Sequence, residues 1–148
     1  GLKLKDHVQE AKANAILQSA QELFLPLNPA VNFAVGDDFV KRRDDMLPFL
    51  QTRFEEFEKI INLNGGRFFI DDTPRACDFA AFHHLDLSRK LDGKIIKDFP
   101  RLEKFLDDIA SLSSIESYLS ERPELIDVSI EPKLVINGKA HPTGTVKT

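Results

Sequence analysis

The stretch TPRACDFAAFHHLD, residues 73–86, decides the fold of this chain. Asp78 stands directly before an apolar run and is predicted to lie in the first turn of a helix. A carboxylate there accepts hydrogen bonds from unpaired backbone N–H groups and stabilises the positive end of the helix dipole. A helix this apolar is expected to pass through the middle of a domain. Thr73, followed by Pro74, is an alternative cap for its first turn.

Upstream of this segment the chain predicts a first helix. Apolar side chains recur at helical spacing over residues 6–25. Pro26 and Pro29 predict the end of that helix, and residues 27–36 then form a connecting segment.

A second helix is expected to begin with Asp37 or Asp38 as its cap and to end at the Asn-Gly-Gly of residues 64–66. Pro48 lies inside its pattern, so either a kink or a short helix followed by a longer one is predicted. Residues 67–70 form a brief extended piece. The apolar stripe of this helix consists of Leu47, Leu50, Phe54, Phe57 and Ile61.

Gly93 closes the central helix, and a fourth helix follows. Residues 113–116, Ser-Ser-Ile-Glu, match a capping box and predict a fifth helix that reaches about Leu119. The remaining residues, 123–148, are predicted to be a non-helical tail, irregular or with one small hairpin at Asn137-Gly138. The sequence therefore predicts an all-α bundle of about five helices over residues 1–122. The fourth helix places on one face Phe99, Leu102, Phe105, Ile109 and Leu112.

Composition limits the possible functions. With 148 residues, 42% hydrophobic and 30% charged, the chain is sized for one soluble domain with its own core. Its formal charge of −4 argues against a nucleic-acid partner. The apolar runs are too short to span a membrane, and no secretory signal is visible. A single Cys excludes an internal disulfide framework and suits a reducing compartment, which leaves cytoplasm and organelle interior both open.

The ordered series of motifs in residues 6–122 resembles the C-terminal, all-helical domain of cytosolic glutathione transferases, most closely the mu and sigma branch. In that family glutathione is held mainly by a thioredoxin-like N-terminal domain, which also supplies the Tyr or Ser that stabilises the thiolate. The resemblance implies that this domain is absent here, so no cofactor is expected, and glutathione is a co-substrate only if that domain is present. The matching segments are residues 47–48, 67–72, 76–79, 85–87, 98–102 and 115–118.

The family's functional positions transfer only in part. Asn14 stands where mu-type enzymes carry an Asp that reaches glutathione in the neighbouring subunit. Phe24 stands where an aromatic residue lines the electrophile pocket, and it lacks the hydroxyl of the mu-type Tyr. Arg75 replaces the Ser or Thr that the family places three residues before the helix-opening acid. If the parent protein is an enzyme, the resemblance makes Asn14 and Phe24 substrate-binding residues.

Other candidate chemistry is weak. His83 and His84 are adjacent on a helix, so their side chains point about 100° apart and do not easily share a metal ion. Cys77 near a helix start is either an activated thiol or a buried one, and burial is favoured. The acidic doublets lack calcium-loop spacing. No metal site and no catalytic residue are therefore expected.

Two functions follow from these observations. The sequence favours a transferase-like helical module without catalysis of its own, used as a structural or docking subunit. The alternative is the C-terminal domain of an active glutathione transferase. A helical domain of this kind is expected to leave an apolar face near Leu23, Phe24 and Leu25, which a protein partner, a second copy or the tail would cover.

Overall fold

The computed structural model describes residues 4–34, 36–122, 134–136 and 139–141. Its helices confirm the all-α prediction, and one short antiparallel strand pair lies in the tail region, with Ile136 opposite Lys139. Residues 137–138, where the hairpin turn is predicted, lie outside the described residues. The elements are α1 (His7–Gln21), α2 (Phe24–Asn28), the π-helical turn η1 (Pro29–Phe33), α3 (Gly36–Asn64), α4 (Ala76–Leu91), the 3-10 turn η2 (Ile95–Asp98), α5 (Pro100–Ala110), α6 (Ser113–Glu121), β1 (Leu134–Ile136) and β2 (Lys139–His141).

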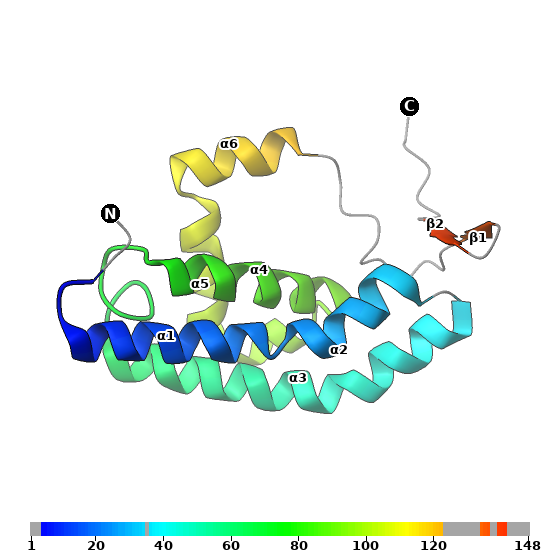
Figure 1. The fold of residues 1–148 in the computed structure, drawn as a ribbon, viewed down its shortest axis with the longest axis horizontal. Coiled ribbons are helices and arrows are strands. Elements are labelled where there is room, and N and C mark those ends of the chain that lie inside the picture. The colour runs from blue at the N-terminus through cyan, green and yellow to red at the C-terminus, as the bar shows by residue number, and fades with distance from the viewer. Residues whose placement is uncertain (1–3, 35, 123–133, 137–138, 142–148) are drawn as a thin grey trace.

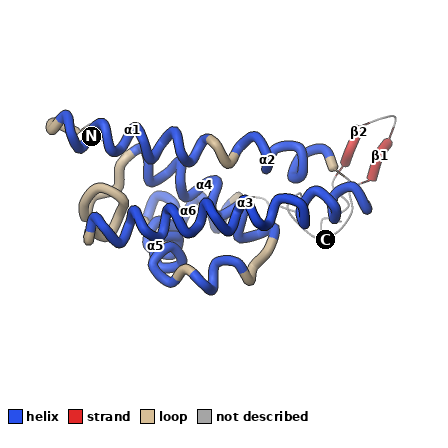
Figure 2. The backbone as a smooth tube through the Cα atoms, turned by 90° about the horizontal axis from the view of Figure 1, so that it is seen from below, coloured by secondary structure: helices blue, strands red, loops and turns tan. Residues whose placement is uncertain are grey.

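Helix α4 has the central position that its apolar sequence predicts. It packs against α1, α3 and α5. Helices α1 and α2 follow one another along the long axis of the molecule, and α3 runs beside them (Figures 1 and 2). Helix α6 packs against α5 and stands apart from the α1–α3 layer. None of its residues is buried. The bundle therefore has a dense side around α4 and a loosely packed side next to α6.

Phenyl rings fill much of the core. The ring centroids of Phe69 and Phe105 lie 4.8 Å apart, and those of Phe57 and Phe69 lie 5.6 Å apart, both with edge-to-face geometry. This is the arrangement that the ring quadrupoles favour. Burial of each such ring stabilises the fold by about 1.5–3 kcal/mol. The rings tie α3 and α5 to the loop that precedes α4.

The end of the first helix differs from the prediction. Helix α1 ends at Gln21, and a short turn leads into α2, which contains Pro26, while Pro29 opens η1. Both prolines lie in the first turn of a short helix, where the missing N–H has no intrahelical partner to lose. Residues 27–36 are thus largely helical, and the predicted connecting segment is wrong.

Helix α3 continues through Pro48 over 29 residues, so the alternative of two separate helices is wrong. Asp37 and Asp38 lie in its first turn, and Gly65, with φ of +67°, follows its last residue. A left-handed glycine at this place is a common helix stop.

Helix α6 begins one residue earlier than its sequence predicts. Leu112 takes the extended backbone of the N-cap, and Ser113 is the first helical residue, so the predicted capping box is absent. No helix in the described part of the chain is both long and apolar enough to cross a bilayer.

Candidate functional site

The start of α4 is organised around the buried carboxylate of Asp78. Its Oδ1 accepts a hydrogen bond of 2.9 Å from the backbone N–H of Phe69, and its Oδ2 accepts one of 2.7 Å from that of Arg75. Burial raises the pKa of Asp78 above its ordinary value, and it outweighs these two hydrogen bonds, which lower it. Asp78 therefore joins the preceding loop to the helix.

Arg75, not Thr73, occupies the N-cap position of α4, which corrects the predicted hydroxyl cap. Thr73 lies two residues upstream and donates its backbone N–H to Asp71 Oδ1 at 2.8 Å. The Arg75 guanidinium pairs with Asp71 Oδ2 at 2.7 Å, and this hydrogen bond lowers the pKa of Asp71. Residues 67–70 are a bent loop rather than an extended piece, because the Phe68 N–H folds back to the Asp71 carbonyl.

Cys77 is buried, and burial, followed by the neighbouring Asp78 charge, raises the pKa of its thiol to about 12. A thiol with this pKa is protonated at neutral pH and is a poor nucleophile. Of the two interpretations that the sequence allowed, the structure supports the buried thiol.

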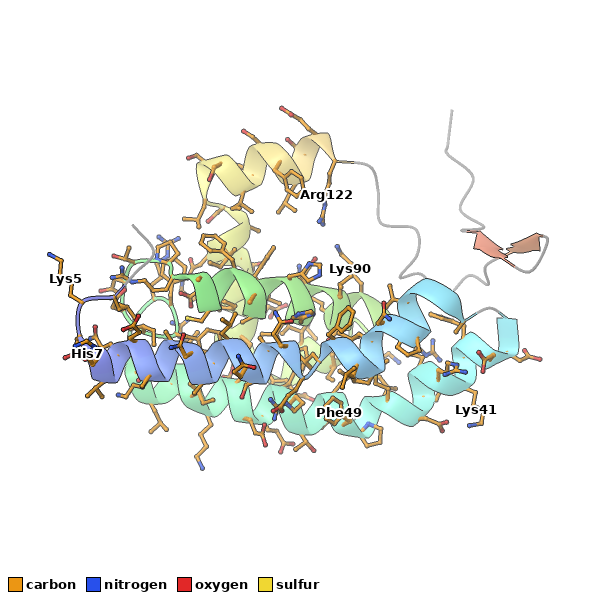
Figure 3. The ribbon with its side chains drawn as sticks, viewed as in Figure 1. Lys5, His7, Lys41, Phe49, Lys90 and Arg122 are labelled. Atoms are coloured by element: carbon orange, nitrogen blue, oxygen red, sulfur yellow. The ribbon has the colours of Figure 1, made fainter. Side chains whose placement is uncertain are left out.

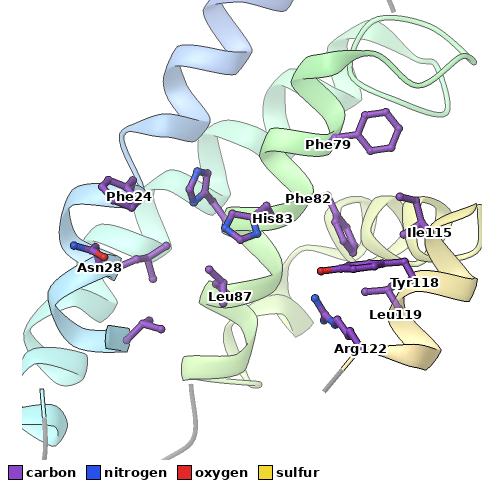
Figure 4. Close-up of a pocket in the computed structure, with 13 residues that line it drawn as sticks. Phe24, Asn28, Phe79, Phe82, His83, Leu87, Ile115, Tyr118, Leu119 and Arg122 are labelled. Atoms are coloured by element: carbon purple, nitrogen blue, oxygen red, sulfur yellow. The ribbon is translucent and has the colours of Figure 1, made fainter. Parts of the chain in front are cut away.

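A groove of about 490 Å³ lies over α4 between α2 and α6 (Figure 4). Helix α4 forms its floor, α2 with η1 forms one wall, and α6 forms the other. The groove exists because α6 packs on α5 and leaves this side of α4 uncovered. It is lined by Phe24, Leu27, Asn28, Val31, Phe79, Phe82, His83, His84, Leu87, Ile115, Tyr118, Leu119 and Arg122.

Both histidines line the groove from α4, His83 as an exposed side chain and His84 as a buried one. His84 is buried, its ring meets Phe24 edge-on at 6.4 Å, and it lies 4.9 Å from the ring of His83. Burial, followed by the charge of His83, lowers the pKa of His84, which makes it a neutral side chain at pH 7. Within the described residues, no group of three or more metal-ligating side chains converges on a point.

Asn14 and Phe24 lie in different cavities. Phe24 lines the groove, whereas the exposed Asn14 lines a smaller cavity of about 230 Å³ between α1 and the start of α4. Asn14 and Phe24 are ten residues apart, and ten residues of helix span about 15 Å, so the two side chains reach different cavities. The structure therefore does not bring these two sequence-derived candidates together.

The apolar face near the end of α1 is smaller than predicted. Leu23 is fully buried in the core, so its predicted exposure is wrong. Phe24 is 48% exposed and Leu25 is 77% exposed. The turn between α1 and α2 rotates Leu23 inward, and two apolar side chains remain at the surface.

Several groove residues were not singled out from the sequence. Phe79, Phe82 and Leu87 recur on one side of α4, and Ile115, Tyr118, Leu119 and Arg122 recur at intervals of three and four along α6. This periodicity was the available signal. A helical stripe is usually core, however, and the sequence alone does not show that these two stripes face each other across a gap.

Comparison with known proteins agrees with this architecture. A family model described as glutathione S-transferase, C-terminal domain, matches residues 29–122. The chain is 22% identical over 128 residues to "Probable glutathione S-transferase 6" of Caenorhabditis elegans, covering 84% of this chain and 62% of that protein. It is 27% identical over 92 residues to "Glutathione S-transferase Mu 1" of Macaca fascicularis, covering 62% of this chain and 41% of that protein.

Solved structures show the same fold. The structure of NaGST-2 superposes with a TM-score of 0.73 at 17% identity, covering 84% of this chain and 62% of that one. The glutathione S-transferase Blo t 8 superposes with a TM-score of 0.72 at 16% identity, covering 96% and 64%. The chain thus spans under two thirds of the relatives that it matches. The family match covers well over half of its residues, and the chain belongs to the glutathione S-transferase C-terminal domain family.

Proposed function

We propose that this chain is a glutathione-transferase-type helical module that binds a hydrophobic small molecule in the groove between α2, α4 and α6 and has no conjugating activity by itself. The groove carries this proposal. Its volume of about 490 Å³ lies within the range of small-molecule sites, about 300–1,000 Å³. Its lining of aromatic and aliphatic side chains with a few polar groups has the composition typical of such sites.

The lack of conjugation is proposed from the groups that the chemistry needs. Conjugation requires a glutathione thiolate and a group that stabilises it. Cys77 is protonated and buried, and the amide of Asn14 offers no carboxylate to the glutathione amine. The resemblance assigns glutathione binding and the activating hydroxyl mainly to a thioredoxin-like domain, which is not among these 148 residues.

The alternative is that the groove forms one wall of the electrophile site in an active transferase. The names of the relatives from Caenorhabditis elegans and Macaca fascicularis favour it. Phe24 lies in the groove wall, as an electrophile-lining aromatic residue would. Both functions use the same groove and differ in whether catalytic groups are supplied to it.

Binding of the neutral fluorescent dye N-phenyl-1-naphthylamine tests the proposal. We expect saturable binding in the micromolar range, weakened several-fold by Phe82→Ala, which removes a ring from the groove. Phe49→Ala is the matched control, because Phe49 is a partly exposed phenyl ring on α3 outside the groove (Figure 3). Equal effects of the two substitutions would refute the site.

A conjugation assay with glutathione and 1-chloro-2,4-dinitrobenzene separates the two functions. The proposal predicts a rate equal to the uncatalysed one. A saturable catalysed rate from these 148 residues would overturn it and establish the enzyme alternative.

A docking role is a second candidate, favoured by the exposed Leu25, which follows the groove residue Phe24 in the sequence. An apolar side chain this exposed, next to the half-exposed Phe24, is suited to an interface. If a second copy covers it, Leu25→Glu should shift the sedimentation coefficient from dimer to monomer and leave dye binding unchanged. An unchanged monomeric coefficient in both proteins would refute self-association.

A further inference from the structure

The groove contains three basic side chains and, among the residues that the structure describes, no acidic one. His83, His84 and Arg122 belong to its lining, whereas no Asp or Glu does. The wall formed by α2 and η1 has no ionisable residue in its sequence. Helices α1, α3 and α5 also pack against α4, but none of their residues lines the groove. A positive charge that forms on the floor of the groove therefore meets no carboxylate in the described lining.

Asp86 is the acid of α4 closest in sequence to His84, and it is already paired. Its Oδ1 accepts Arg89 at 2.6 Å, and its Oδ2 accepts Lys90 at 2.8 Å. Arg122 Nη2 lies 3.9 Å from the same Oδ2. Two residues along a helix point about 200° apart around its axis, so Asp86 and His84 project to different sides of α4. Asp86 is therefore not placed to neutralise a charge on His84.

His84 lies between a phenyl ring and a second imidazole. The residue is 5% exposed and lines the groove, so water reaches it from there. Its ring centroid lies 6.4 Å from that of Phe24 on the facing wall and 4.9 Å from that of His83 beside it (Figure 4). A phenyl ring gives an imidazolium no hydrogen-bond acceptor, and a protonated His83 repels it. These surroundings favour the neutral imidazole, in agreement with the lowered pKa of His84.

From this arrangement we infer that His84 is a proton switch of the groove: neutral ligands bind while its imidazole is neutral and are released when it is protonated. A ligand that fills the groove excludes the water that would hydrate the imidazolium. The described lining offers no carboxylate in exchange, so the bound state disfavours the charged ring. This inference rests on the proposed binding function and adds its regulation by pH.

The direction and size of the effect follow from linkage. A ligand that binds the form with neutral His84 loses apparent affinity only below the pKa of that ring, by about tenfold for each pH unit. This pKa lies below its ordinary value of 6.5, so the affinity should be constant at pH 7.5 and above. At pH 5.5, one unit below that ordinary value, we expect the affinity to be several-fold weaker, with about tenfold as the upper limit.

Fluorescence titration of the full chain with N-phenyl-1-naphthylamine at pH 7.5, 6.5 and 5.5 tests the inference. The aromatic amine of this dye stays neutral over the whole range, so a change in affinity reports the protein. The measured quantity is the ratio of the dissociation constants at pH 5.5 and 7.5. Thermal melts at each pH verify that the chain and its variants are folded.

Substitutions then assign the pH dependence to one ring. His84→Gln should bind the dye equally at pH 7.5 and 5.5. His83→Gln should keep the fall in affinity and move its onset to higher pH, because the charge that lowers the pKa of His84 is gone. This shift tests the switch without altering His84 itself. His7→Gln is the matched control, because His7 is an exposed histidine on α1 outside the groove, and its profile should equal that of the unaltered chain.

The outcomes are distinct. Saturable binding at pH 7.5 with the same affinity at pH 5.5 overturns the inference and leaves the proposed function intact. An equal fall in affinity in His84→Gln and the unaltered chain does the same, because another group is then the switch. Failure of the dye to bind at pH 7.5 overturns both the inference and the proposed function.

Discussion

Replacement of Asp78 by Ala is the most direct test of how this fold is held together. The substitution removes the acceptors of two backbone N–H groups, those of Phe69 and Arg75. The Phe69 donor is buried, and leaving it unpaired costs about 1–3 kcal/mol. Loss of the bond to the Arg75 N–H removes a helix cap, which costs about 1 kcal/mol.

Together these terms predict a loss of about 2–4 kcal/mol in the free energy of unfolding. The raised pKa of Asp78 shows that its buried charge is itself costly, so removal of the charge offsets part of this loss. For a domain of this size, 1 kcal/mol corresponds to about 2–4 °C in Tm. We therefore expect Asp78→Ala to lower Tm by at least about 4 °C.

Asp78→Asn and Asp71→Ala complete the experiment. Asn keeps one carbonyl oxygen but turns an NH₂ group toward the other N–H, so its Tm should lie between those of the unaltered chain and Asp78→Ala. Asp71 is a half-exposed acid in the preceding loop, and its removal should cost much less. Scanning calorimetry measures all three. Equal melting of Asp78→Ala and Asp71→Ala would refute the central role of the buried carboxylate.

Three further predictions concern single side chains. The pKa of Cys77 is about 12, so only about one thiol in 10,000 is ionised at pH 8. Ellman's reagent should therefore react with Cys77 at the rate of unfolding. Rapid labelling of the native chain would contradict this. Burial and His83 lower the pKa of His84, so the unfolded chain binds more protons than the folded one below pH 6.5, and stability falls there. When the pH is lowered from 7.5 to 5.5, the Tm of His84→Gln should therefore fall less than that of the unaltered chain. An equal fall in Tm would contradict this. Glu58 accepts the first backbone N–H groups of α5 at 3.2 and 2.8 Å, so Glu58→Ala should lower Tm by about 2–8 °C and the exposed Glu55→Ala by less, and equal shifts would argue against this cap.

The sequence predicted the central helix well because its signals are local. Asp78 before an apolar run is a helix start wherever the chain places it, and Gly65 stops α3 by its own backbone freedom. The prolines led to a wrong prediction because their effect depends on tertiary contacts. Pro26 is incompatible with the interior of a helix but compatible with the first turn of a new one, and tertiary packing decides whether a new helix begins. Leu27, buried in the core, supplies that packing.

The start of α6 shows the same limit. A Ser-x-x-Glu box at Ser113 is a good cap in isolation, but Leu112 is partly buried against the core and adopts the extended N-cap backbone instead. The groove could not be predicted at all, because it depends on the position that α6 takes relative to α4. That position of α6 also places Arg122 beside a carboxylate that two other cations already hold.

One face of helix α4 packs into the core, and another lines the groove. Substitutions on the groove face therefore test the binding proposal separately from stability. Asp78 and Leu85 face the core, whereas Phe82 and Leu87 are only partly buried and face the groove. A core substitution changes Tm first, and any loss of binding follows from unfolding. A groove substitution removes a side chain at the edge of the core, so it should lower Tm less than a core substitution does. Loss of dye binding in Phe82→Ala at nearly unchanged Tm would therefore report the site itself.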